Sequence, residues 1–178
     1  EIAYDKPAVL KITAKSGYVL GKLTVDNQVV NLPEGTFDAT TKVTTYAAYT
    51  TANLKTAMSI NVEFTAKKTV SVSASPLSAT RDEIAADKNL PTVTFTPSIS
   101  GQKYQFKNAS GTLMDKLPAT DGVYTIVATS PETADYAALT DESNKFTISQ
   151  ANKLSWSVEG EQGTVTAKMG DKDVANGG

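Results

Sequence analysis

Hydrophobic and polar residues alternate over several short stretches of the chain, which is the pattern of β-strands with one face in a core. The clearest stretch is 123–128, Val-Tyr-Thr-Ile-Val-Ala, which follows the turn pair Asp121-Gly122. A second stretch, 145–148, places Phe146 and Ile148 on one face and is expected to close the same sheet. Such a closing hairpin is typical of a small β-sandwich.

The first half of the chain has the same alternation. Residues 59–65 give its cleanest example, with Ile60, Val62 and Phe64 predicted to point inward and the polar residues between them to face water. Residues 26–28, Asp-Asn-Gln, predict a hairpin loop, because Asp and Asn tolerate the left-handed backbone of a tight turn. Further strands are expected within 8–14, 18–20, 22–25, 29–32, 70–74, 103–106, 154–158 and 164–169.

Three other segments differ from this pattern. Residues 50–58 are expected to form one helical turn, since Leu54 and Met58 share a helical spacing. Residues 90–97 are expected to form an edge strand because prolines bracket it. The charged residues Arg81, Asp82 and Glu83 are expected to interrupt the strands as a loop.

The order of these segments predicts an all-β fold made of tandem small β-sandwich or Ig-like domains. The pair Lys67-Lys68 marks the expected junction, which is short and stiff because no Gly/Pro linker stands there. The predicted domains are 1–67, 68–150 and 151–178. The third range reads as a β-hairpin, which buries too little to be stable alone. Residues 151–178 therefore either complete a sheet elsewhere in the chain or begin a further repeat. We expect the chain to be a fragment of a longer protein.

Composition removes much chemistry from consideration. The 178 residues contain no Cys and no His, which excludes thiolate nucleophiles, imidazole bases and the commonest zinc ligands. We therefore predict no enzyme activity, no catalytic residues, no metal and no cofactor. A net charge of −2 provides no basic surface for nucleic acid, and no apolar stretch approaches a membrane span. Strands rich in Thr, Ala, Ser and Val without a disulfide favour a bacterial exported protein, and the alternative is a cytosolic protein, which also lacks disulfides.

Clusters of acidic residues are candidates for metal or catalytic sites, or for turns. Two of them resemble parts of calcium loops, but neither has the full ligand register, so turns are the favoured interpretation. Asp82 and Glu83 could form a carboxylate pair for glycoside hydrolysis or lie in a solvated loop, and the loop is the favoured interpretation. The calcium-like clusters are Asp171, Asp173 and Asn176, and Asp141, Glu142 and Asn144.

Aromatic residues raise the question of sugar binding. Stacking on sugars and packing in a core are both open to Tyr46, Tyr49, Tyr104 and Trp156, and core packing is favoured. The sequon at 108–110 is expected to be an ordinary turn. A Lys-Asn isopeptide bond between Lys11 and Asn144 is a further hypothesis, which an intact mass without loss of ammonia would dismiss. Ligand-binding residues remain unassigned.

Residues 69–149 resemble bacterial Ig-like repeats of the MBG type, which occur in tandem on secreted and surface-anchored proteins. The resemblance rests on 121–125, on the Ser-Pro-Glu-Thr-Ala-Asp-Tyr run ending at Tyr136, and on 146–148. The stretches 16–19, 23–26 and 59–64 carry a second resemblance: residues 8–66 resemble the latter part of another bacterial surface repeat, of Gly-Tyr type, with Leu23 where that repeat usually has Trp. The opening strand of the same repeat type resembles residues 163–167.

These resemblances imply an extracellular, non-catalytic structural or adhesive module of a bacterial surface or secreted protein, acting as a stalk or spacer. The alternative is an accessory carbohydrate-binding region of a secreted carbohydrate-active enzyme. We expect a monomer whose partner is a host or cell-wall glycan or protein.

Overall fold

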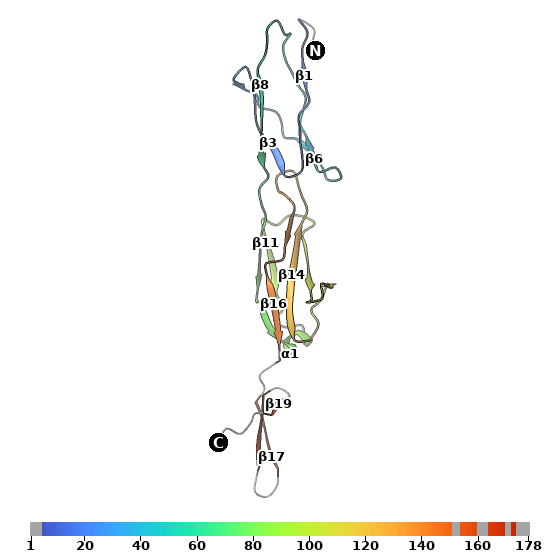
Figure 1. The fold of residues 1–178 in the computed structure, drawn as a ribbon, viewed down its shortest axis with the longest axis vertical. Coiled ribbons are helices and arrows are strands. Elements are labelled where there is room, and N and C mark those ends of the chain that lie inside the picture. The colour runs from blue at the N-terminus through green and yellow to red at the C-terminus, as the bar shows by residue number, and fades with distance from the viewer. Residues whose placement is uncertain (1–4, 151–153, 160–163, 170–171, 174–178) are drawn as a thin grey trace. The chain divides into compact units, whose positions relative to one another are not determined.

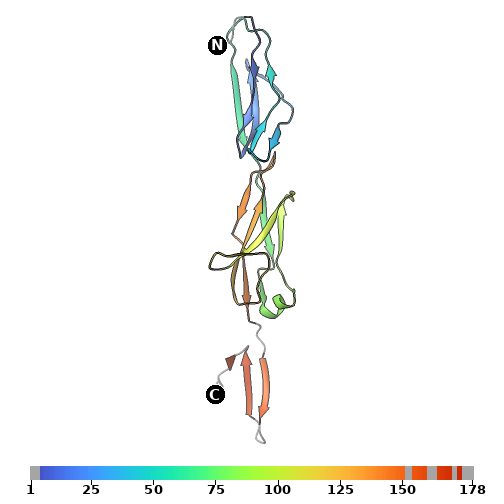
Figure 2. The same ribbon diagram turned by 90° about the vertical axis from the view of Figure 1, so that its right-hand side faces the viewer.

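The computed structural model describes residues 5–150, 154–159, 164–169 and 172–173, with side chains described for 5–150. Its elements are nearly all β-strands, as the sequence predicts, arranged in β-sandwich fashion (Figures 1 and 2). The described residues form two compact units. Unit 1 contains 5–71, 95–103 and 129–140, and unit 2 contains the remaining described residues. The domains predicted from the sequence are segments that fold independently, whereas these units are defined by compactness. The predicted domain ranges therefore stay a prediction.

Unit 1 contains eight strands from the first part of the chain, in three small sheets with the orders β1-β7, β2-β6-β5 and β4-β3-β8. The hairpin loop between β3 and β4 is confirmed, with Asp26 and Asn27 at φ 49° and 64°. The core of the unit is built on Ile12, Leu23 and Val25. The strands are β1 (Val9–Leu10), β2 (Thr13–Ala14), β3 (Tyr18–Val25), β4 (Gln28–Val29), β5 (Thr36–Asp38), β6 (Val43–Thr45), β7 (Tyr49–Thr50) and β8 (Ile60–Ala66).

Strand β8 has its predicted inner face, but the burial predicted for that face is only partly right. Ile60, Val62 and Phe64 oppose Val25, Leu23 and Leu20 of β3, respectively, so all three lie on the side of the core. Val62 is half-buried, whereas Ile60 and Phe64 are 41% and 43% exposed. The reason is the position of β8 at the edge of its sheet, where β3 is its one partner among the described strands.

The helical turn predicted within 50–58 is wrong. Thr50 ends β7, and the backbone that follows bonds to the start of the chain: Leu54 N–H donates to the Lys6 carbonyl, and Asp5 N–H donates to the Leu54 carbonyl. Met58 contacts the core from a segment without regular secondary structure. These long-range backbone bonds replace the bonds that a single helical turn would make.

The helix lies instead in the predicted loop around Asp82 and Glu83. Helix α1 (Arg81–Ala85) begins with a capping box, in which Thr80 Oγ1 accepts from Glu83 N–H and Glu83 Oε2 accepts from Thr80 N–H. The sequence signal Thr-x-x-Glu was present at 80–83. The hydrogen bonds from Thr80 lower the pKa of Glu83.

Unit 2 contains the turn and closing strand that the sequence indicated most clearly. Tyr124, Ile126 and Ala128 are buried along β14, and β14 pairs antiparallel with β16, which buries Phe146 and Ile148. The larger sheet has the order β10-β16-β14-β12-β13, and β15 also pairs with β14. Strand β11 pairs with β9 and with no other described strand, as expected of the predicted edge strand. The strands are β9 (Ser71–Ser75), β10 (Ser78–Thr80), β11 (Thr92–Thr96), β12 (Lys103–Lys107), β13 (Leu113–Met114), β14 (Gly122–Ser130), β15 (Leu139–Asp141) and β16 (Lys145–Ser149), some of which extend into unit 1 at one end.

The last part of the chain forms a three-stranded antiparallel sheet. It consists of β17 (Leu154–Glu159), β18 (Thr164–Met169) and β19 (Lys172–Asp173), in that order. Both alternating stretches predicted there, 154–158 and 164–169, are strands.

Candidate functional site

A buried ion pair lies in unit 1, between Lys67 at the end of β8 and Glu132 in the segment after β14. Lys67 Nζ lies 2.7 Å from Glu132 Oε1, and the two side chains are 0% and 3% exposed. Charged side chains are rarely buried to this degree unless they are paired. We therefore take this buried pair as the first candidate site.

Two other segments of unit 1, and the residue that follows Glu132, complete the surroundings of this pair. Ser16 Oγ donates to Glu132 Oε2 at 2.6 Å, and Gly17 N–H donates to Glu132 Oε1 at 2.7 Å. Lys67 Nζ also donates to the Thr133 carbonyl at 2.6 Å. The same Nζ lies 4.1 Å from the centroid of the Phe37 ring, which is a cation–π contact. We call these six residues the Glu132 cluster: Ser16, Gly17, Phe37, Lys67, Glu132 and Thr133.

Local backbone structure presents these groups to one another. Gly17 adopts φ +81° in the turn before β3, a conformation that glycine adopts readily and that directs its N–H to Glu132. Lys67 N–H donates to the Gly17 carbonyl, so the end of β8 is held beside the same turn. The next residue, Lys68, forms a parallel bridge with Tyr136, with backbone bonds to Asp135 and Ala137. The segment that carries Glu132 is thus bonded to Lys68 a few residues after the carboxylate.

The carboxylate of Glu132 is held in its ionised form. Burial alone would raise its pKa, but the hydrogen bonds from Lys67, Ser16 and Gly17, together with the Lys67 charge, outweigh burial. Their combined effect lowers the pKa of Glu132 from 4.5 to about 2. Both oxygens are engaged, so the group is arranged to fasten segments rather than to exchange protons near neutral pH.

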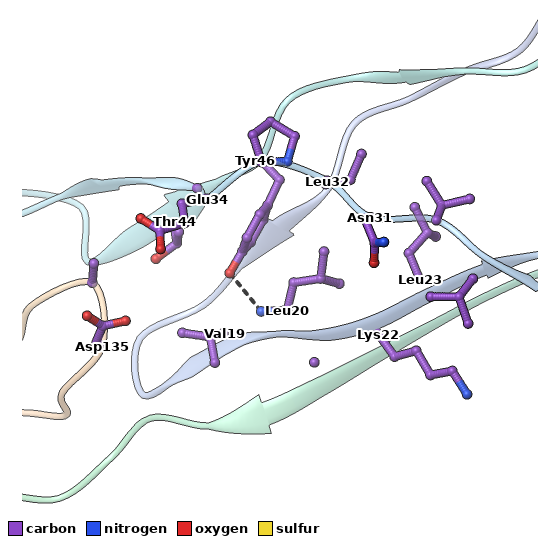
Figure 3. Close-up of a pocket in the computed structure, with 16 residues that line it drawn as sticks. Val19, Leu20, Lys22, Leu23, Asn31, Leu32, Glu34, Thr44, Tyr46 and Asp135 are labelled. Atoms are coloured by element: carbon purple, nitrogen blue, oxygen red, sulfur yellow. Dashed lines mark hydrogen bonds between the residues drawn. The ribbon is translucent and has the colours of Figure 1, made fainter.

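A cavity of about 360 Å³ lies elsewhere in unit 1, beside the ring of Tyr46 (Figure 3). Its size falls within the usual range for small-molecule pockets, about 300–1,000 Å³. Neither Lys67 nor Glu132 lines it. The lining comes from β3, from the end of β4 and the segment that follows it, from β6 and the residue just after it, and from the segment after Glu132. Its residues are 19–23, 29–35, Thr44, Tyr46, Ala134 and Asp135.

The half-buried ring of Tyr46 is fixed in the wall of this cavity. Its hydroxyl accepts a hydrogen bond from Leu20 N–H at 2.7 Å, drawn as the dashed line in Figure 3. The backbone at Gly35 lies close against the same wall, because a Cβ there would meet Thr44 Cγ2 at 2.6 Å and Tyr46 Cε1 at 2.9 Å. Thr44 is 2% exposed, and its Oγ1 has no hydrogen-bond partner among the described residues. An unsatisfied buried hydroxyl costs about 1–3 kcal/mol.

A second hollow, of about 320 Å³, is lined by Thr13, Lys15, Tyr18 and Phe64. Tyr18 is 51% exposed and Phe64 is 43% exposed. Tyr18 opposes Ala66 and Leu20 opposes Phe64, so the two aromatic side chains project from the same face of neighbouring strands. Sequence reasoning assigned Phe64 to the core and did not single out Tyr18 as a site.

The cluster around Asp141 forms a turn, as predicted. Asp141 Oδ1 accepts from the N–H and the hydroxyl of Ser143, and Glu142 pairs with Lys107. In the described part of the chain, no group of three or more Asp and Glu residues is placed to hold a metal ion. The cluster at 171–176 lies outside the residues whose side chains are described.

The sequon is a turn, as predicted, because Asn108 Oδ1 accepts from Ser110 N–H and Thr112 N–H. The two residues of the isopeptide hypothesis belong to different units: Lys11 is exposed in unit 1, and Asn144 is in unit 2, where its carbonyl accepts from Ile126 N–H.

The aromatic residues considered for sugar binding have different surroundings. Tyr46 and Tyr49 contact the core of unit 1, as predicted. Tyr104 is 41% exposed and makes an edge contact with Phe106, with ring centroids 5.7 Å apart, so core packing is wrong for it. The side chain of Trp156 lies outside the described residues.

The chain matches no family model, no curated protein and no solved structure. The described helix is too short to cross a membrane. The resemblance to bacterial surface repeats therefore stays a prediction.

Proposed function

We propose that this chain is a non-catalytic structural or adhesive module of an extracellular bacterial surface or secreted protein, where it acts as a stalk or spacer. The Glu132 cluster is the observation that carries the proposal. It joins parts of unit 1 that are far apart in the sequence, since Ser16 and Lys67 lie 116 and 65 residues from Glu132. Such cross-connections suit a module that bears load.

The cluster takes the place that a disulfide has in many exported modules. The chain has no Cys, so covalent cross-links between thiols are not open to it. Separating Lys67 from Glu132 without unfolding their surroundings leaves a buried charge without compensation, which costs about 3–5 kcal/mol. The penalty arises as soon as the segments separate, and this property suits resistance to pulling.

Single-molecule force spectroscopy on the whole chain, held by its two ends, tests the proposal. The variant Glu132→Gln is expected to lower the force at which unit 1 unfolds. Glu142→Gln is the matched control, because Glu142 pairs with Lys107 at the surface, with its side chain 46% exposed. Equal unfolding forces for the wild type and Glu132→Gln would contradict a load-bearing role.

The second candidate is an accessory carbohydrate-binding region, and the exposed pair Tyr18 and Phe64 favours it. Aromatic faces beside a hollow suit stacking on the apolar face of a sugar. A glycan array tests this function directly. Binding that is lost in both Tyr18→Ala and Phe64→Ala and kept in Tyr104→Ala supports it, and the absence of binding to any glycan argues against it.

A further inference from the structure

The cavity beside Tyr46 carries uncompensated negative charge. Glu34 and Asp135 both line it, both are exposed, and neither side chain has a hydrogen-bond or ion-pair partner in the described part of the chain. Lys22 is the one basic residue among the lining residues. In the view of Figure 3, Glu34 and Asp135 lie toward the end where Thr44 is drawn, and the Lys22 amine points away at the opposite end. The cavity therefore has an acidic end.

Apolar side chains line part of the remaining wall. Val19, Leu20 and Leu32 contribute aliphatic side chains, and Tyr46 contributes the face or edge of its ring. A ligand that matches both parts has an apolar stem and a positively charged tip. An aromatic ring in the same wall attracts a cation as well.

Thr44 supplies an independent indication of a missing polar partner. Its side chain lines the cavity, is almost fully buried, and has an Oγ1 without a hydrogen-bond partner among the described residues. Buried hydroxyls are nearly always satisfied in folded proteins. A donor group that enters the cavity from the acidic end would provide the missing bond after a small local adjustment.

We propose that this cavity binds a primary ammonium group at the end of an unbranched alkyl chain, as in the lysine side chain of a partner protein. An ammonium group has three donors, which suit two carboxylates and a hydroxyl oxygen. A neutral sugar matches the hydroxyl and the ring but leaves the excess charge of Glu34 and Asp135 uncompensated. This assignment goes beyond the structural role and does not depend on the Glu132 cluster.

Titration of the whole chain with Nα-acetyllysine methylamide, followed by amide chemical shifts in NMR spectra, tests the assignment. The matched ligand is Nα-acetylnorleucine methylamide, which has an uncharged, slightly shorter alkyl chain ending in methyl. We expect a dissociation constant in the millimolar range for the lysine compound and at least about tenfold weaker binding for the norleucine compound. The shifts should appear at Leu20, Gly35 and Thr44, and should weaken with added NaCl.

Pentylamine and methyl glucoside extend the test. Pentylamine that binds as well as the lysine compound shows that the ammonium and its stem suffice. Pentylamine that binds more weakly shows that the peptide part adds contacts, and both results support the assignment. Tighter binding of methyl glucoside than of the lysine compound would overturn it in favour of a sugar site.

Charge removal at the acidic end gives the decisive comparison. Glu34→Gln and Asp135→Asn are each expected to weaken binding about two- to fivefold, the range for pairs that solvent reaches. Glu63→Gln is the control, because Glu63 is exposed on β8 and does not line the cavity. Unchanged spectra of the free variants show that folding is intact. Equal binding of the lysine and norleucine compounds, no shifts at any concentration, or no effect of either variant would overturn the proposal.

Discussion

Replacing Glu132 by Gln isolates the charge of the buried pair. Glutamine has the same shape and keeps one oxygen for the Gly17 N–H and the Lys67 ammonium, while its amide can donate to the Ser16 hydroxyl. The ammonium of Lys67, which is 0% exposed, then lacks a counter-charge. It retains the Thr133 carbonyl and the face of Phe37. The substitution therefore tests electrostatics with little change in volume.

Two lines of reasoning give the same magnitude for this change. Removing one partner of a buried ion pair costs about 3–5 kcal/mol, and the neutral bonds that Gln keeps place the expected loss near the lower end. Lowering the pKa of Glu132 from 4.5 to about 2 corresponds to about 3 kcal/mol of stabilisation at neutral pH. We expect Glu132→Gln to reduce the free energy of unfolding of unit 1 by about 3 kcal/mol.

Urea denaturation followed by circular dichroism, with amide hydrogen exchange to assign the loss to unit 1, measures this difference. Because the folded pKa is depressed, the stabilisation is complete above pH 4.5 and is lost as the pH falls toward about 2. The gap between wild type and Glu132→Gln should therefore close over this interval. A gap below about 1 kcal/mol at neutral pH, or one that is the same at pH 5 and pH 2, would refute the reasoning.

A double-mutant cycle with Lys67→Met separates pairing from burial. Lys67→Met removes the buried cation and keeps an unbranched apolar side chain of similar length. In the double variant, no charge of the pair remains, so we expect it to be more stable than Glu132→Gln alone. A double variant that loses the sum of both single losses would show that the two residues act independently.

Other substitutions test the packing. Phe146→Ala should lower the free energy of unfolding by about 3–5 kcal/mol, because Phe146 is 0% exposed. Phe64→Ala should lower it by less than half as much in the same denaturation assay, because Phe64 is 43% exposed. Tyr124→Phe should cost about 1 kcal/mol, since it removes the hydroxyl that bonds to Thr120, and an unchanged midpoint would contradict this. Thr44→Val should leave stability unchanged or raise it by up to about 1 kcal/mol, because it removes an unsatisfied hydroxyl, and a loss above 1 kcal/mol would mean that the hydroxyl is satisfied.

The strands that local pattern determines were predictable from the sequence. Tyr124, Ile126, Phe146 and Ile148 alternate with polar residues, and a sheet with one buried face uses that alternation directly. The exposure of residues on a strand at the edge of a sheet was not predictable. Phe64 lies on the predicted face, yet its burial depends on whether a further strand covers β8, which no local pattern states.

The candidate site was missed because its parts are distant in the sequence. Lys67 in a Lys-Lys pair and Glu132 in a Ser-Pro-Glu run both have the appearance of solvated residues. Their burial arises when β8 and the segment after β14 meet the turn at Gly17. Glu132 is 65 residues from Lys67 and 115 residues from Gly17 in the sequence. The capping box at 80–83, by contrast, is a local signal that sequence reasoning could have used.

The pH titration of the Glu132 side chain tests the central claim most directly. The claim is that this buried carboxylate is ionised and fastened by Lys67, Ser16 and Gly17. Carbon-13 NMR of the Glu132 carboxyl, recorded as the pH is lowered, reports its protonation alone. The account predicts a midpoint near about 2. A midpoint near the ordinary value of 4.5 would contradict it.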